Sequence, residues 1–161
     1  MQVPLVLPKT FGLTDMNAGY YCHFSTGKLL YDPGKGTKKF DPWWVILECD
    51  KGIVDFYIWL AARNGVVISK NLLWGSHISV VKGEEPPKKE NWGKDFGEVR
   101  LWHTNIIRTD NGMHAWVDAW SEDLAKIRQE LGLTDVKMSY HITLGRVVID
   151  GRNCGDKRME I

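Results

Sequence analysis

The chain has 161 residues, of which 43% are hydrophobic and 25% are charged, and its formal net charge is +1 at pH 7. This composition is that of an ordinary globular protein, long enough for one domain with a sizeable core. The near-neutral charge argues against duplex DNA or an anionic membrane surface as a partner, but it is compatible with a small or local anionic ligand.

The cysteines and the N-terminal segment suggest a compartment. Cys22, Cys49 and Cys154 are far apart and form no Cys-x-x-Cys pair, which argues against a disulfide framework or a zinc knuckle. The segment MQVPLVLPKTF has no basic leader, and the sequence contains no run of about 18 apolar residues. We therefore expect a cytoplasmic protein without an export or membrane signal.

The first half of the chain predicts a strand, a helix and a second strand. Residues 43–50, WWVILECD, are bulky and apolar, as in a buried strand. Residues 53–65, IVDFYIWLAARNG, have helical spacing of apolar side chains and end in Asn-Gly, a pair that can terminate a helix. Residues 74–83, WGSHISVVKG, then predict a strand in which His77 stands two positions before Ser79.

Two polar segments predict loops. Residues 31–42, YDPGKGTKKFDP, lack the glycine and lysine spacing of a phosphate-binding loop, so we expect a solvated basic turn whose lysines can attract an anionic ligand. Residues from about 82 to 98 are charged and rich in Pro and Gly, which predicts the connector between the two halves of the chain.

The second half repeats the order of the first. The segments VRLWHTNIIRT and MHAWVDAW flank Asp-Asn-Gly, a strong signal for a tight hairpin. Ser121 predicts the N-cap of a helix in SEDLAKIRQELGL, and Gly132 predicts its end. Residues 139–148, SYHITLGRVV, then place His141 two positions before Thr143, so a structural duplication is indicated.

The geometry of a strand gives each repeat a polar face. Successive side chains point to opposite faces, so His77 and Ser79 share one face, opposite Ile78. His141 and Thr143 have the same relation. Two such faces that meet would surround one small volume with two imidazoles and two hydroxyls. This set suits phosphodiester cleavage without a metal, with a neutral imidazole as base, an imidazolium as acid and hydroxyls holding the non-bridging oxygens.

The paired H-x-[S/T]-hydrophobic strands, each after a strand and a helix, resemble the two-histidine (2H) phosphoesterase superfamily, also called LigT-like. The resemblance extends roughly from Trp43 to Ile149, and Ser79 stands where the family often has Thr. It implies one bilobal α+β domain over residues 1–161, with two pseudo-repeated β-α-β units whose antiparallel sheets surround a central cleft. The resemblance implies no cofactor and assigns catalysis to four residues: His77, Ser79, His141 and Thr143.

Members of this family cleave 2′,3′-cyclic phosphates, 2′-5′ linkages or cyclic oligonucleotide signals. Because the chain is small and has no ligase or kinase partner domain, we expect a stand-alone hydrolase for a cyclic nucleotide or cyclic oligonucleotide. Compact members include phage-encoded anti-CBASS proteins, which destroy the cyclic nucleotide signals of bacterial antiviral defence. Three alternatives stay open: an RNA-end 2′,3′-cyclic or 2′-5′ phosphodiesterase, a non-catalytic nucleotide-binding module, and an interaction protein with structural histidines.

A third H-x-[S/T] tripeptide, His23 with Ser25, has no preceding helix and no following hydrophobic pair. We interpret it as a chance match or a residue at the edge of the cleft. A metal site shared by His103 and His114 is not expected. A two-residue turn at Asn111-Gly112 would pair His103 with Trp120 and His114 with Thr109, which separates the two histidines by on the order of 20 Å.

Aromatic residues near the motifs are candidates for stacking on bases. Trp74 and Tyr140 have the opposite strand parity from the histidines, so they reach the same face only if a bulge intervenes. The candidates by position are Tyr20, Tyr21, Trp74 and Tyr140.

Overall fold

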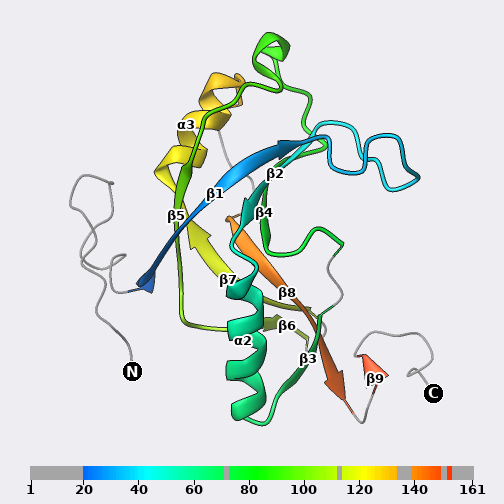
Figure 1. Ribbon diagram of the computed structural model, residues 1–161, viewed down its shortest axis with the longest axis vertical. Helices are drawn as coiled ribbons and strands as arrows, with labels where there is room; N and C mark the ends of the chain where they lie inside the picture. Colours follow the sequence, from blue (N-terminus) through cyan, green and yellow to red (C-terminus); the bar gives the residue numbers. More distant parts are fainter. Residues whose placement is uncertain (1–19, 71–72, 112–113, 134–138, 150–151, 154–161) are drawn as a thin grey trace.

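The computed structural model describes residues 20–70, 73–111, 114–133, 139–149 and 152–153 (Figure 1). The elements of the first half are β1 (His23–Tyr31), β2 (Trp44–Cys49), α2 (Gly52–Arg63), β3 (Val67–Ser69) and β4 (His77–Lys82). The connector contains the short 3-10 helix η2 (Lys89–Asn91). The second half contains β5 (Val99–His103), β6 (Arg108–Asp110), β7 (His114–Trp120), α3 (Glu122–Glu130), β8 (His141–Ile149) and β9 (Arg152–Asn153).

The strands form one antiparallel sheet in the order β3-β8-β7-β5-β1-β2-β4, with β6 added to β7 and β9 to β8. The predicted α+β class is therefore confirmed. The two halves share this sheet instead of having one sheet each. They meet where β1 pairs with β5, so the order β1-β2-β4 on one side mirrors β5-β7-β8 on the other.

Most of the predicted elements are present, because their signals are local. The expected helices are α2 and α3, and Ser121 caps α3 by accepting a hydrogen bond from the backbone N–H of Leu124 at 3.0 Å. The strand β1 and the short β3 were not predicted. β1 occupies the middle of the sheet, and β3 leaves the first half to pair with β8 of the second.

One hydrophobic core lies between the helices and one face of the sheet, which we call the core face. It is lined by Leu47, Ile78, Leu101, Val117 and Ile142, all fully buried. Burial of each such side chain contributes about 1.5–3 kcal/mol, so this face fixes the register of the strands that carry them, β2, β4, β5, β7 and β8. We call the other face, which carries His77, Ser79, His141 and Thr143, the histidine face.

The predicted duplication extends to the register of the strands. In both halves an acidic residue stands opposite the histidine, and one extra residue interrupts the pairing directly after the hydroxyl residue. The pairs are Glu48–His77, Ile46–Ser79 and Val45–Val81 in the first half, and Asp118–His141, Trp116–Thr143 and Ala115–Gly145 in the second. The extra residues are Val80 and Leu144, so β4 and β8 contain a β-bulge at the same position.

Each bulge changes which residues share the histidine face. In a regular strand, Lys82 would point away from His77, because the two residues are an odd number of positions apart. The extra residue Val80 shifts the alternation, and both Val80 and Val81 are buried in the core. Lys82 consequently lies opposite Trp44 on the histidine face.

The curl of the sheet brings β4 and β8 together. These strands are not neighbours in the hydrogen-bonded order, yet their Cα atoms approach within 8 Å, and Figure 1 shows them side by side at the centre of the molecule. The helices link the halves, because α2 packs against β8 and α3 packs against β4. Each histidine strand is therefore held in place by a helix of the other half.

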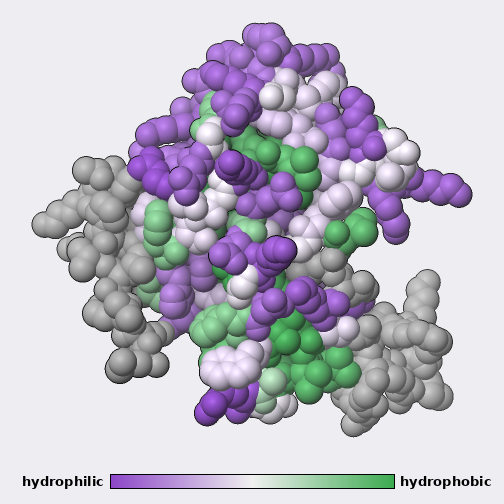
Figure 2. Space-filling model, viewed as in Figure 1, coloured by the Kyte–Doolittle hydropathy of each residue, from purple (hydrophilic) through white to green (hydrophobic). Residues whose placement is uncertain are grey.

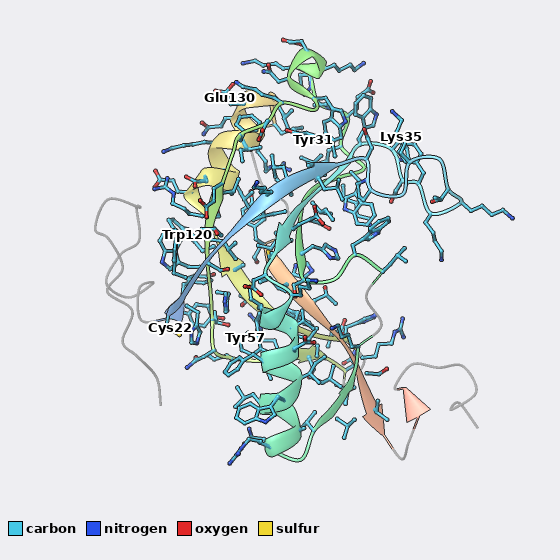
Figure 3. All side chains as sticks on the ribbon, in the orientation of Figure 1. Cys22, Tyr31, Lys35, Tyr57, Trp120 and Glu130 are labelled. Carbon is cyan, nitrogen blue, oxygen red and sulfur yellow. The ribbon has the colours of Figure 1, made fainter. Side chains whose placement is uncertain are left out.

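The segments predicted as polar loops connect β1 to β2 and β4 to β5. Lys35, Lys38 and Lys39 are exposed, as expected for a solvated turn, and Lys35 projects away from the sheet (Figure 3). The surface over this loop and over η2 is mostly hydrophilic, whereas apolar atoms gather where α2 leads into β3 (Figure 2). In the described part of the chain, no helix has the length and apolar character needed to span a membrane.

Candidate active site

His77 and His141 lie on the histidine face, on the two strands that the curl brings together. They interact electrostatically, since a charge on His141 disfavours a charge on His77. The pair expected from the sequence is thus brought together. Their hydroxyl partners, Ser79 and Thr143, lie on the same face at equivalent positions.

The backbone holds both imidazoles in the same way. Nδ1 of His77 lies 2.9 Å from the carbonyl oxygen of Gly75, and Nδ1 of His141 lies 3.3 Å from that of Ser139. A carbonyl oxygen only accepts hydrogen bonds, so Nδ1 donates and carries the proton in each ring. Nε2 of each neutral imidazole therefore has the lone pair and can accept a proton.

The surroundings of His77 favour its neutral form. Burial is the main cause that lowers its pKa, and the charges of His141 and Lys82 lower it further. The hydrogen bond to Gly75 and the charge of Glu48 act in the opposite direction and are outweighed. At neutral pH, His77 is therefore an uncharged base.

Trp44 connects the first histidine to its hydroxyl partner. Its Nε1–H donates a 3.1 Å hydrogen bond to Oγ of Ser79, and its ring meets the His77 ring edge-on with 6.3 Å between centroids. Because Ser79 Oγ accepts this bond, its own O–H is directed to another acceptor. Trp44 is only 7% exposed, so it orients its neighbours and offers little surface for stacking.

The second histidine lines a cavity of about 530 Å³. His141, Thr143, Trp116 and Asp118 form part of its wall, and this volume is in the range of small-molecule sites. His77 lies outside this wall. The cavity is therefore a pocket of the second half, open to solvent next to the His141 imidazole.

A buried carboxylate stands opposite His141. Asp118 accepts hydrogen bonds from Nη1 of Arg108 at 2.7 Å, from the Tyr20 hydroxyl at 2.8 Å and from Nε1 of Trp116 at 3.1 Å. Burial alone would raise the pKa of Asp118, but these donors outweigh burial and lower it. Asp118 is thus a carboxylate at neutral pH. Its network was not predicted, because the sequence gives no sign of which donors surround it.

The candidate stacking residues have different positions. Tyr21 meets the Tyr20 ring edge-on at 4.8 Å beside Asp118, and Trp74 meets Trp44 edge-on at 6.2 Å. Tyr140 packs against the core, where burial raises its pKa to about 12. The structure therefore brings Tyr21 and Trp74 to the surroundings of the site and leaves Tyr140 on the other side of the sheet.

The third H-x-[S/T] pair lies on the core face. The ring of His23 stacks on that of His103 with 5.2 Å between centroids. The hydroxyl of Tyr57, which lies on α2 (Figure 3), is 2.8 Å from Nδ1 of His103. His23 and Ser25 line a separate cavity of about 340 Å³ beside α2. The third pair is therefore separated from the other two by the sheet itself.

The hairpin between β6 and β7 has a different register from the predicted one. His114 lies opposite Asp110 instead of Thr109, and His103 lies opposite Ala119 instead of Trp120. The expectation from a two-residue turn is therefore wrong by one position. His103 points to the core face, where it contacts Tyr57 of α2, and His114 lines the cavity of the histidine face, so the two rings are on opposite sides of the sheet.

Comparison with known proteins identifies no relative. No protein-family model, curated protein or solved structure matches this chain. The arrangement of the two histidines, their hydroxyl partners and the surrounding charges is consequently the basis for assigning a function.

Proposed function

We propose that the protein is a metal-independent phosphodiesterase in which His77 and His141 form an acid–base pair, within a bilobal fold of the LigT-like type. The observation that carries the proposal is the matched pair of strands. Each presents an imidazole with a free Nε2 and a hydroxyl two residues later, and the two strands face each other across the curl of the sheet.

The chemistry follows from the two imidazoles. The oxygen of a water molecule attacks phosphorus, and its proton passes to Nε2 of His77 as the new P–O bond forms. The bond to the leaving oxygen breaks, and that oxygen takes a proton from Nε2 of protonated His141. The hydroxyls of Ser79 and Thr143 donate to the non-bridging oxygens, where charge develops. Proton exchange with solvent then restores both histidines.

The asymmetry of the site assigns the two roles. His77 is the base because burial and neighbouring charges lower its pKa. His141, the other imidazole of the pair, is then the acid, and it lines the solvent-open cavity from which it can take up a proton. The low pKa of the base keeps His77 deprotonated as the pH falls, so activity extends to mildly acidic pH.

The substrate we propose is a cyclic nucleotide or cyclic oligonucleotide. The cavity beside His141 has room for a nucleotide, and the aromatic rings of Trp116, Tyr20 and Tyr21 surround its buried carboxylate. Such rings are suited to stacking on bases. A cyclic ligand would place one phosphodiester between the histidines and a base in this cavity.

A substrate panel in excess EDTA tests the proposal. It contains 2′,3′-cyclic mononucleotides, 2′-5′ dinucleotides, and cyclic di- and trinucleotides, offered to the wild type and to the His77→Ala and His141→Ala variants. We expect cleavage of a cyclic di- or trinucleotide in EDTA, and a fall in kcat of at least about 10²-fold in each variant. His23→Ala, from the third H-x-[S/T] pair, is the matched control and keeps its turnover.

The other outcomes have clear meanings. Cleavage of 2′,3′-cyclic mononucleotides alone would keep the mechanism and replace the substrate by an RNA end. Binding without cleavage of any member of the panel would overturn the proposal in favour of a nucleotide-binding module. Thermal unfolding of every variant separates loss of chemistry from loss of fold.

A further inference from the structure

Lys82 is a charged neighbour of the histidine pair that the mechanism above does not use. Its Nζ lies 4.8 Å from the centroid of the Trp44 ring, on the residue that orients Ser79 and contacts His77. Its charge also acts directly on His77. Its contact with Trp44 and the action of its charge thus place this ammonium in the surroundings of the reactive imidazole.

Arg146 is the equivalent residue of the second half. The bulge at Leu144 shifts the alternation of β8, so Arg146 lies opposite His114 on the histidine face. On its other side it pairs with Ser69 of β3. In each half, one bulge therefore brings a histidine, a hydroxyl residue and a cation onto one face in the same order.

A side chain of the helix α3 holds the bulge in β4 in place. Nη1 of Arg128, whose side chain is 3% exposed, donates to the carbonyl oxygen of Val80 at 2.9 Å and to Glu84 at 2.8 Å. An unpaired carbonyl at a bulge is thereby satisfied. The placement of Lys82 next to His77 is consequently a built feature of the fold and does not depend on a flexible loop.

We propose that Lys82 and Arg146 bind the non-bridging oxygens of the phosphoryl group held between the two histidines, one cation from each half. This inference rests on the proposed function for its substrate. A phosphodiester is an anion, and the charge on its oxygens grows in the transition state, where fixed cations stabilise it. The guanidinium can bind two oxygens at once, and the ammonium acts as a point charge.

Lys82 has a second effect, on the ionisation of His77. The charged and titratable groups that act on His77 are Lys82 on its own strand, Glu48 on β2 and His141 on β8. Lys82 and His141 oppose the imidazolium, whereas Glu48 favours it. Removal of the Lys82 charge therefore shifts the balance toward the charged imidazole and raises the pKa of His77.

An NMR titration of the unliganded protein tests this placement without any substrate. We expect the pKa of His77, followed through its ring Cε1–H signal, to be higher in Lys82→Met than in the wild type. Lys126→Met, in which an exposed lysine of α3 is removed, is the matched control and leaves the titration unchanged. An unshifted titration in Lys82→Met would place the ammonium away from His77 and overturn the inference.

Binding of inorganic phosphate tests the ligand, with the histidine signals as the readout. We expect the Kd for phosphate to rise roughly tenfold in Lys82→Met and in Arg146→Met, since each loses one charged hydrogen bond. Lys82→Arg keeps most of the affinity, and Lys126→Met keeps all of it. Wild-type affinity in both Met variants overturns the inference. Weakened binding in a protein that cleaves nothing would retain the cation pair and reject only the enzymatic function.

Discussion

The two halves of the sheet have the same register around the histidine but different surroundings. In the first half, Arg128 holds the bulge, and the acidic residue opposite the histidine, Glu48, is exposed. In the second half, β3 pairs along β8, and the equivalent acid, Asp118, is buried among three donors.

This difference shows how a symmetric scaffold acquires an asymmetric function. Hydrolysis needs one neutral and one protonated histidine at the same time, and identical surroundings would give both the same ionisation. Burial and the charges of Lys82 and His141 favour a neutral His77, whereas His141 lines a cavity that is open to solvent. The shared register fixes the geometry, and the different surroundings determine the roles.

The largest effect is expected where the first half depends on a single side chain. Arg128→Met removes the donor to Val80 and breaks the ion pair with Glu84, in which the arginine side chain is 3% exposed. We expect a loss of about 3 kcal/mol in the free energy of unfolding, measured by urea denaturation, because the variant removes one partner of a largely buried ion pair.

Two further variants sharpen this result. Arg63→Met removes an exposed arginine at the end of α2 and changes stability by less than about 0.5 kcal/mol. Adding Glu84→Gln to Arg128→Met recovers part of the loss, since a neutral amide is less costly than a carboxylate in this partly buried position. A loss below about 1 kcal/mol in Arg128→Met would show that the bulge holds its shape without the guanidinium.

The second half depends instead on the close approach of β3. A Cβ at Gly145 would lie 2.1 Å from the carbonyl oxygen of Ser69, and the φ angle of Gly145 is 147°. We expect Gly145→Ala to lower the free energy of unfolding by about 2–3 kcal/mol and to increase hydrogen exchange in β3.

The control separates the clash from the backbone strain. Gly93 also has a positive φ, 92°, but a Cβ there meets nothing within 4 Å. Gly93→Ala should therefore lower the free energy of unfolding by only about 1 kcal/mol, because it introduces backbone strain without a clash. Equal losses in the two variants would mean that β3 moves aside easily and contributes little to the second half.

The elements with strong local signals were predicted from the sequence, and those that depend on distant partners were not. The helices α2 and α3 and the two histidine strands were expected from periodicity, capping residues and alternation. β1 was not, because Gly27 interrupts its pattern. That glycine is needed because a Cβ would lie 2.3 Å from the carbonyl oxygen of Glu48.

The site was predicted in part for the same reason. His77 and Ser79 share one face because side chains two positions apart in a strand point the same way, and this spacing can be read from the sequence. The position of Lys82 depends on the bulge, and VVK carries no mark of an extra residue. The donors around Asp118 come from Tyr20, Arg108 and Trp116, and only the tertiary fold brings them together.

A smaller effect is expected from the two acids. Asp118→Asn should lower the free energy of unfolding by about 1.5 kcal/mol at pH 7, because it weakens hydrogen bonds to a buried charge. Glu48→Gln should change it by less than about 0.5 kcal/mol, since Glu48 is exposed. Urea denaturation of both variants measures the contrast.

The pH dependence of the free energy of unfolding shows whether the charge of Asp118 stabilises the fold. Its pKa is lower in the folded protein than in the unfolded chain, where it is about 3.9. The stabilisation is therefore complete above about pH 4 and is lost as the pH falls through the folded pKa. The difference in the free energy of unfolding between the wild type and Asp118→Asn should therefore become smaller below pH 4. A constant difference would point to lost packing instead of lost charge.

The smallest effect is expected from the third H-x-[S/T] pair. Ser25 lies on the core face beside His23, on the opposite side of the sheet from His77. Ser25→Ala should leave kcat and KM within about twofold of the wild type, whereas Ser79→Ala should lower kcat by about tenfold or more, because a donor to the phosphoryl oxygens is lost. Equal effects of the two variants would mean that position on the sheet does not decide which hydroxyl takes part, and the distinction between the histidine face and the core face would fail.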